Sequence, residues 1–112
     1  MGDKASVLVA DDDTDIRELV VFKLEQSGDD VVAVPDGEVA LASLREQRPQ
    51  PAILDIMMPG LSGLDVLHEI RADEALSDLR VILLTARSRD LDVDAGFSTG
   101  ADGYVIKPFS PR

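Results

Sequence analysis

Four short apolar runs constrain the fold of this chain more than any other feature of its sequence. Each run is followed by one or two polar residues that could act on a phosphate group. The runs and their polar ends are Val7-Leu8-Val9-Ala10 before Asp11 and Asp12, Ala52-Ile53-Leu54 before Asp55, Val81-Ile82-Leu83-Leu84 before Thr85, and Tyr104-Val105-Ile106 before Lys107. Continuous apolar runs are typical of parallel strands buried on both faces. If the runs pair in one parallel sheet, all of these polar groups emerge at the same edge, where open α/β sheets place their ligand sites.

Segments with helical periodicity separate the apolar runs. The first segment has Thr14 as its predicted N-cap, and its apolar face consists of Ile16, Leu19, Val20 and Leu24. Two further helices are predicted at residues 39–44 and 64–71, and residues 31–34 are predicted to form another short strand. Residues 89–99 predict a weaker helix, because they contain poor helix formers. This alternation predicts an α/β domain in which helices cover a parallel sheet.

The composition limits the function classes that this chain can serve. Its 112 residues are enough for one domain with a single core. With 22 acidic and 11 basic residues, its formal net charge is −11, which argues against direct binding of nucleic acid or of an anionic membrane surface. The chain has no cysteine, so any metal ion must be held by oxygen ligands. Because we find no secretion signal and no apolar stretch long enough to span a membrane, we expect a cytoplasmic location.

The order of the elements predicts that one face of the sheet lacks a covering helix. A parallel sheet needs helices on both faces, and the first predicted helix alone belongs securely to one of them. Beyond Lys107 the chain has residues 108–112. Loss of one helix would leave about three or four core side chains unburied, which costs about 5–10 kcal/mol. We therefore expect an N-terminal fragment of a longer protein, truncated after the fifth strand, and a homodimer through the uncovered face would compensate.

The motifs at the strand ends together resemble the receiver domain of two-component response regulators. In chain order they are Val9-Ala10-Asp11-Asp12, Ile53-Leu54-Asp55-Ile56-Met57-Met58-Pro59, Leu84-Thr85-Ala86, Gly100-Ala101-Asp102-Gly103-Tyr104 and Lys107-Pro108-Phe109. The resemblance covers residues 6–109 in the family's order and spacing. It implies a flavodoxin-like, doubly wound, five-stranded parallel sheet in the strand order 2-1-3-4-5. In the family a fifth helix follows Lys-Pro-Phe, and the chain departs from the pattern at this point.

The resemblance assigns the acidic residues to phosphoryl transfer. It implies that Asp55 accepts the phosphoryl group, that Asp12 and Asp55 ligate Mg²⁺ (or Mn²⁺) directly, and that Asp11 acts through water. The backbone carbonyl of Met57, and not its side chain, is the remaining protein ligand that the family implies. On physical grounds, a divalent cation would also relieve the repulsion among these crowded carboxylates.

The other motif residues are implied to complete the reaction and to report it. Lys107 would pair with the acidic cluster and then with a phosphoryl oxygen, and the hydroxyl of Thr85 would donate to another oxygen. Thr85 and Tyr104 form the implied switch, which relays phosphorylation to the surface of the fourth helix and fifth strand. The family's Lys-Pro bond is cis, so the resemblance implies a cis bond between Lys107 and Pro108. The implied donor is a phosphohistidine of a sensor histidine kinase or phosphotransfer protein, so the domain is regulatory, with self-phosphorylation and autodephosphorylation as its own chemistry.

Two other interpretations stay open at this point. One is a receiver-like interaction module that is never phosphorylated, which the intact set of motif residues argues against. The other is a phosphohydrolase of the haloacid dehalogenase type, with Asp11 as its nucleophile and Asp13, Thr85 and Lys107 in supporting positions. That enzyme class leaves Asp55 without a role, and it expects a later acidic pair beyond the lysine.

Overall fold

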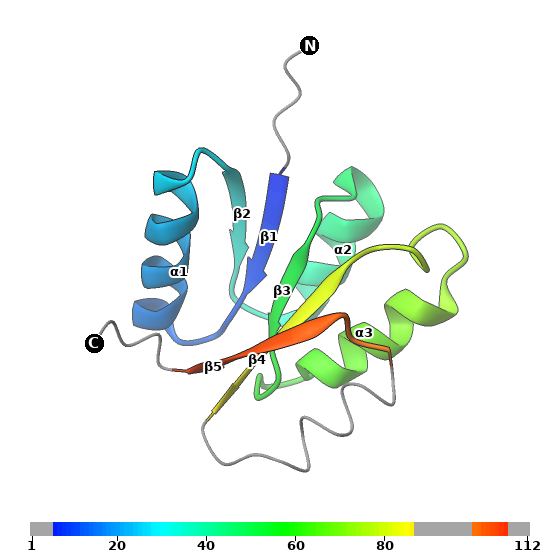
Figure 1. Cartoon of the computed structure of the whole chain (residues 1–112). Helices are drawn as coiled ribbons and strands as arrows, with labels where there is room; N and C mark the ends of the chain where they lie inside the picture. The colour runs from blue at the N-terminus through cyan, green and yellow to red at the C-terminus, as the bar shows by residue number, and fades with distance from the viewer. Residues whose placement is uncertain (1–5, 87–99, 108–112) are drawn as a thin grey trace.

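Strands and helices alternate over residues 6–86, as the sequence predicted (Figure 1). The structure is a computed structural model that describes residues 6–86 and 100–107. The strands are β1 (Ser6–Ala10), β2 (Asp30–Val34), β3 (Ala52–Asp55), β4 (Val81–Ala86) and β5 (Gly103–Lys107). The helices are α1 (Thr14–Gln26), α2 (Gly37–Gln47) and α3 (Gly63–Ala72). The helix expected over residues 89–99 and the bond between Lys107 and Pro108 lie outside the described residues.

All of these strands form one parallel sheet in the order β2-β1-β3-β4-β5 (Figure 1). This order confirms the flavodoxin-like, doubly wound architecture that the resemblance implied. At the end of β1, Ala10 is paired with Val34 of β2 on one side and with Leu54 of β3 on the other. Because parallel strands end on the same side, one edge of the sheet collects the residues that follow β1 and those that end β3.

Alternate residues of β1 face opposite sides of the sheet and belong to two apolar clusters. Leu8 lies in the larger cluster, which α2 and α3 cover with side chains that include Leu44 and Leu67. Val9 lies in the smaller cluster, which α1 covers with side chains that include Val20. Figure 1 shows the resulting layers, with α1 on one side of the sheet and α2 and α3 on the other.

The start of α1 differs by one residue from the prediction. Asp13, and not Thr14, is the N-cap, and its Oδ1 accepts the backbone N–H of Asp15 at 3.0 Å and that of Ile16 at 3.2 Å. The prediction of Thr14 as the cap is wrong because the Asp13 carboxylate satisfies two free N–H groups and also meets the positive end of the helix dipole.

In residues 6–86 and 100–107, no helix has the length and apolarity needed to cross a bilayer.

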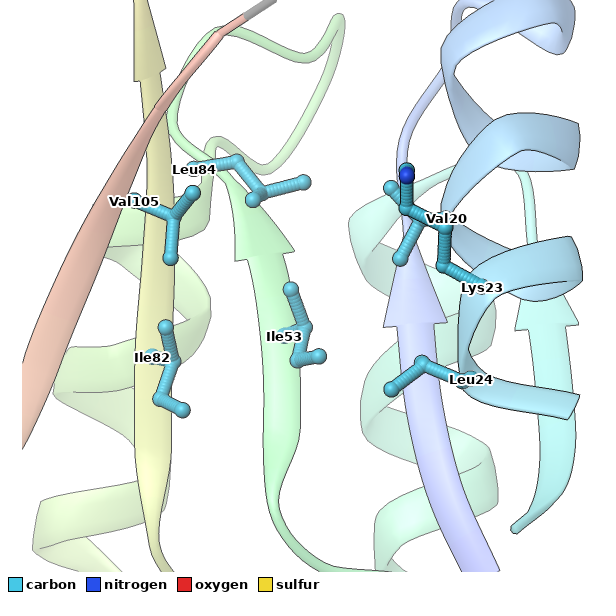
Figure 2. Close-up of a pocket in the computed structure, with 7 residues that line it drawn as sticks. All are labelled: Val20, Lys23, Leu24, Ile53, Ile82, Leu84 and Val105. Atoms are coloured by element: carbon cyan, nitrogen blue, oxygen red, sulfur yellow. The ribbon is translucent and has the colours of Figure 1, made fainter. Parts of the chain in front are cut away.

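An open apolar groove lies on the α1 side of the sheet (Figure 2). Its volume is about 300 Å³, and Figure 2 shows the side chains that line it: Val20, Lys23, Leu24, Ile53, Ile82, Leu84 and Val105. Val105 of β5 keeps 39% of its surface exposed. Within the described residues α1 is the helix on this face, and its side chains line one side of the groove while those of β4 and β5 line the other. The expected fragment and homodimer stay predictions.

Arg71, near the end of α3, ties three segments together at the amino ends of β4 and β5. Its Nε donates to the carbonyl of Gly100 at 2.9 Å, and its Nη1 donates to the carbonyl of Leu79 at 2.6 Å. Its Nη2 donates to Oδ2 of Asp102 at 3.0 Å, and that oxygen also accepts the backbone N–H of Val81 at 2.8 Å. One side chain therefore fixes the approach of β5 to β4.

We expect Arg71→Gln to lower the free energy of unfolding by about 2–3 kcal/mol, because it removes charge-assisted bonds to backbone carbonyls and to a carboxylate. Urea titration followed by circular dichroism measures this difference. The matched control is Arg45→Gln, because Arg45 pairs with Glu69 and Asp73 on the surface and its side chain is 50% exposed. Its loss is expected to cost less than about 1 kcal/mol. Equal effects of the two substitutions would contradict the structural role given to Arg71.

Gly63, the first residue of α3, packs directly against the end of β3. Its N–H donates to the carbonyl of Ile56 at 3.0 Å. A Cβ atom at this position would overlap the backbone oxygen of Asp55 and would lie 2.9 Å from its carbonyl carbon. We expect Gly63→Ala to destabilise the fold by about 1–3 kcal/mol in a urea titration, because backbone atoms must shift to admit the methyl group. Gly103→Ala is the control, since a Cβ there meets nothing within 4 Å, and a comparable loss in it would contradict this explanation.

Candidate functional site

Three carboxylates meet at the edge of the sheet where β1 and β3 end. Asp11 follows β1 directly, Asp12 comes next, and Asp55 is the last residue of β3. Each offers one carboxylate oxygen, and these oxygens all lie within 4.8 Å of one another. The in-register pairing of β1 with β3 causes this convergence, because it brings their carboxyl ends side by side.

The carboxylates differ in burial and in what holds them. Asp11 is 0% exposed and Asp55 is 2% exposed, whereas Asp12 is exposed to solvent. Oδ1 of Asp11 accepts the backbone N–H of Asp13 at 2.9 Å, and Oδ1 of Asp55 accepts that of Met57 at 3.4 Å. The Asp11 backbone N–H donates to the carbonyl of Val34 at 3.2 Å. Each of the two buried acids thus accepts a backbone N–H, and the third acid, Asp12, is exposed to solvent.

The donor set of this cluster fits a hard divalent cation. Carboxylate oxygens are the ligands that Mg²⁺ and Mn²⁺ prefer, and Mg²⁺ keeps several waters beside one or two carboxylates. Burial of two carboxylates close to a third is unfavourable without positive charge nearby. Asp11, Asp12 and Asp55 are therefore the residues that could hold such an ion. Met57 is 55% exposed, and the ligand role of its carbonyl stays a prediction.

The register of the sheet brings two further predicted residues to the same edge. Asp55 is paired with Leu84, so Thr85 comes one residue later on the adjacent strand β4. Lys107, the last residue of β5, is paired with Ala86. For Thr85, Tyr104 and Lys107 the structure describes the backbone, and their side-chain roles stay predictions.

Arg17 also contacts this site, and the sequence analysis missed it. Its Nη1 donates to the backbone carbonyl of Asp11 at 2.7 Å, and its Nη2 lies 3.5 Å from the hydroxyl of Thr14. The available signal was a basic residue in the second turn of a helix that follows an acidic strand end, because helical side chains lean toward the helix start. That signal is weak, because a basic residue at this position of a helix is ordinarily solvated.

The comparisons with known proteins agree with this geometry. The family model for the response regulator receiver domain matches residues 7–112. The chain is 42% identical over 106 residues to the DNA-binding response regulator MtrA of Mycolicibacterium smegmatis. The aligned residues cover 95% of this chain and 45% of that protein. It is 47% identical over 109 residues to the transcriptional regulatory protein CseB of Streptomyces coelicolor, and this alignment covers 97% of this chain and 45% of that protein. The chain thus spans about half the length of the curated relatives it matches.

Solved structures show the same fold. A putative response regulator from Chloroflexus aurantiacus superposes with a TM-score of 0.93 at 30% identity, over 97% of this chain and 89% of that chain. The chemotaxis protein CheY4 of Vibrio cholerae superposes with a TM-score of 0.88 at 30% identity, over 97% of this chain and 91% of that chain. Family match, sequence identity and fold agree, and the chain belongs to the response regulator receiver domain family.

Proposed function

We propose that this chain is a phosphorylation-dependent switch that accepts a phosphoryl group on Asp55 from a phosphohistidine of a sensor histidine kinase or phosphotransfer protein. Receiver domains of response regulators serve two-component signalling, and this chain belongs to that family. The observation that carries the proposal is the convergence of Asp11, Asp12 and Asp55 within 4.8 Å at the carboxyl edge of the sheet. Such a site suits phosphoryl transfer, which depends on positioning and on charge neutralisation.

In the proposed reaction, a carboxylate oxygen of Asp55 attacks the phosphorus of the donor. A P–O bond to Asp55 forms as the P–N bond of the phosphohistidine breaks, and the imidazole keeps the electron pair and takes a proton. Burial and the Met57 N–H hold the Asp55 carboxylate in one orientation for this attack. Mg²⁺ or Mn²⁺, held by Asp12, Asp55 and the Met57 carbonyl and by Asp11 through water, would neutralise charge on the phosphoryl oxygens.

Lys107 and Thr85 take the remaining phosphoryl oxygens in this proposal. The position of Thr85 one residue beyond the partner of Asp55 supports its role, as does the position of Lys107 at the end of β5. Thr85 then moves toward the phosphoryl group and Tyr104 follows it, which changes the surface that the resemblance assigns to the fourth helix and β5. Water later hydrolyses the acyl phosphate, which resets the switch.

The alternatives are less compatible with the contacts at this site. In a haloacid dehalogenase-type hydrolase, Asp11 would be the nucleophile and Asp13 would assist it. The Asp13 carboxylate instead caps α1, where it accepts the backbone N–H groups of Asp15 and Ile16. A module that is never phosphorylated would not need Asp55 buried beside Asp11 and Asp12. Both alternatives are tested by the experiment below.

We also propose that the domain acts in the cytoplasm, where it would meet its phosphoryl donor, and that it does not bind nucleic acid itself. The formal net charge of −11 supports the second point. The names of the relatives, a DNA-binding response regulator and a transcriptional regulatory protein, favour a transcriptional output for the whole protein. The homodimer expected from the sequence stays a prediction.

Incubation with acetyl phosphate and Mg²⁺ is expected to add about 80 Da, one phosphoryl unit, to the chain in an intact-mass measurement. Asp55→Asn should abolish the addition, because it removes the nucleophile, and chelation of the metal should do the same. The matched control is Asp13→Asn, which keeps a good N-cap and should still be phosphorylated. Turnover of acetyl phosphate that Asp11→Asn abolishes and Asp55→Asn leaves intact would support the hydrolase instead. No addition and no turnover would support the inert module.

The switch can be followed by fluorescence, because Tyr104 is the single tyrosine of the chain and there is no tryptophan. We expect the emission of Tyr104 to change when acetyl phosphate is added. Thr85→Ala should still gain the phosphoryl mass but lose most of the change in Tyr104 emission, because the hydroxyl that links phosphorylation of Asp55 to Tyr104 is gone. Thr85→Ser keeps the hydroxyl and should restore the response. A full fluorescence change in phosphorylated Thr85→Ala would contradict the proposed relay.

A further inference from the structure

Arg17 binds the backbone on both sides of Asp12. Its guanidinium donates to the carbonyl of Asp11 at 2.7 Å, and its own backbone N–H donates to the carbonyl of Asp13 at 2.9 Å. Between these two contacts, the N–H of Asp13 donates to Oδ1 of Asp11 at 2.9 Å. The three consecutive peptide groups around Asp12 are therefore each held by a hydrogen bond, and Arg17 makes the first and the third.

The exposed position of Asp12 makes this backbone support important. Asp11 and Asp55 are buried, so packing holds them in place. Asp12 is exposed, so the direction of its carboxylate depends on the orientation of the peptide groups around it. A hydrogen bond between a charged donor and the Asp11 carbonyl is a strong restraint on the first of these groups.

We propose that Arg17 is a positioning residue of the acidic site, which holds the peptide between Asp11 and Asp12 so that the Asp12 carboxylate meets those of Asp11 and Asp55. The inference rests on the proposed function, because it concerns the residues that would hold Mg²⁺ there. Residues that orient metal ligands without touching the metal contribute strongly to its affinity.

The charge of Arg17 and its hydrogen bond have opposite effects on cation binding. A guanidinium close to the site repels Mg²⁺, so a role as counter-charge alone predicts that its removal strengthens metal binding. A positioning role predicts that its removal weakens binding, because the Asp12 carboxylate is no longer held toward the other two. The sign of the change in affinity therefore separates the two roles.

The test is calorimetric titration of Mg²⁺ into the full chain of 112 residues and its variants at physiological ionic strength. Arg17→Gln is expected to raise the Kd for Mg²⁺ on the order of tenfold. Arg17→Lys keeps the charge but replaces the planar guanidinium with a single ammonium group, so about a threefold rise is expected. The matched control is Arg45→Gln, which removes the same charge from the last turn of α2 and should change the Kd by less than about twofold because of salt screening.

A second measurement separates positioning from loss of fold. Urea titration without metal should show that Arg17→Lys stays folded with nearly unchanged stability, so that its weaker Mg²⁺ binding reflects the site. The backbone amide of Asp12 should shift in the NMR spectrum of metal-free Arg17→Lys. Mg²⁺ binding in Arg17→Gln and Arg17→Lys that is as tight as in the unsubstituted chain, or tighter, overturns this inference and leaves the proposed function standing. Absence of Mg²⁺ binding in the unsubstituted chain overturns both.

Discussion

The parallel pairing of β1 with β3 is the constraint on which the rest of this structure depends. In-register pairing places Ala10 beside Leu54, so the acids that follow these residues reach the edge of the sheet together. The apolar sides of β1 supply the free energy for this pairing, because Leu8 and Val9 are completely buried on opposite faces. Burial of apolar strands therefore forces acidic side chains together at the strand ends.

Local hydrogen bonds make this concentration of like charge tolerable. Asp11 accepts a backbone N–H, and so does Asp13, which caps α1.

Gly63 permits α3 to begin directly against the end of β3, where a larger residue would displace the Asp55 backbone. Arg71 anchors the far end of the same helix to the approaches of β4 and β5. One helix thus contacts the end of β3, which carries Asp55, at one end and the approach to β5 at the other.

Much of the fold could be predicted from the sequence, because buried parallel strands have continuous apolar runs and the helices have clear periodicity. All four apolar runs that end in polar residues are strands, and the acids that end the first two lie together. The N-cap of α1 was misplaced by one residue, because Asp13 and Thr14 are both good caps and the choice between them depends on backbone geometry. The contacts of Arg71 could not be predicted, because they join residues that are up to 31 positions apart.

The sequence by itself determined the strands, their polar ends and the family, since these depend on local apolar patterns and on motifs at set spacing. The tertiary structure alone decided that Asp11 and Asp55 are buried while Asp12 is exposed. It also decided that Arg17 contacts the Asp11 carbonyl and that an apolar groove opens between α1 and β5. The physical reason is that exposure and hydrogen bonding depend on which elements pack against a residue, and packing is settled when the whole sheet forms.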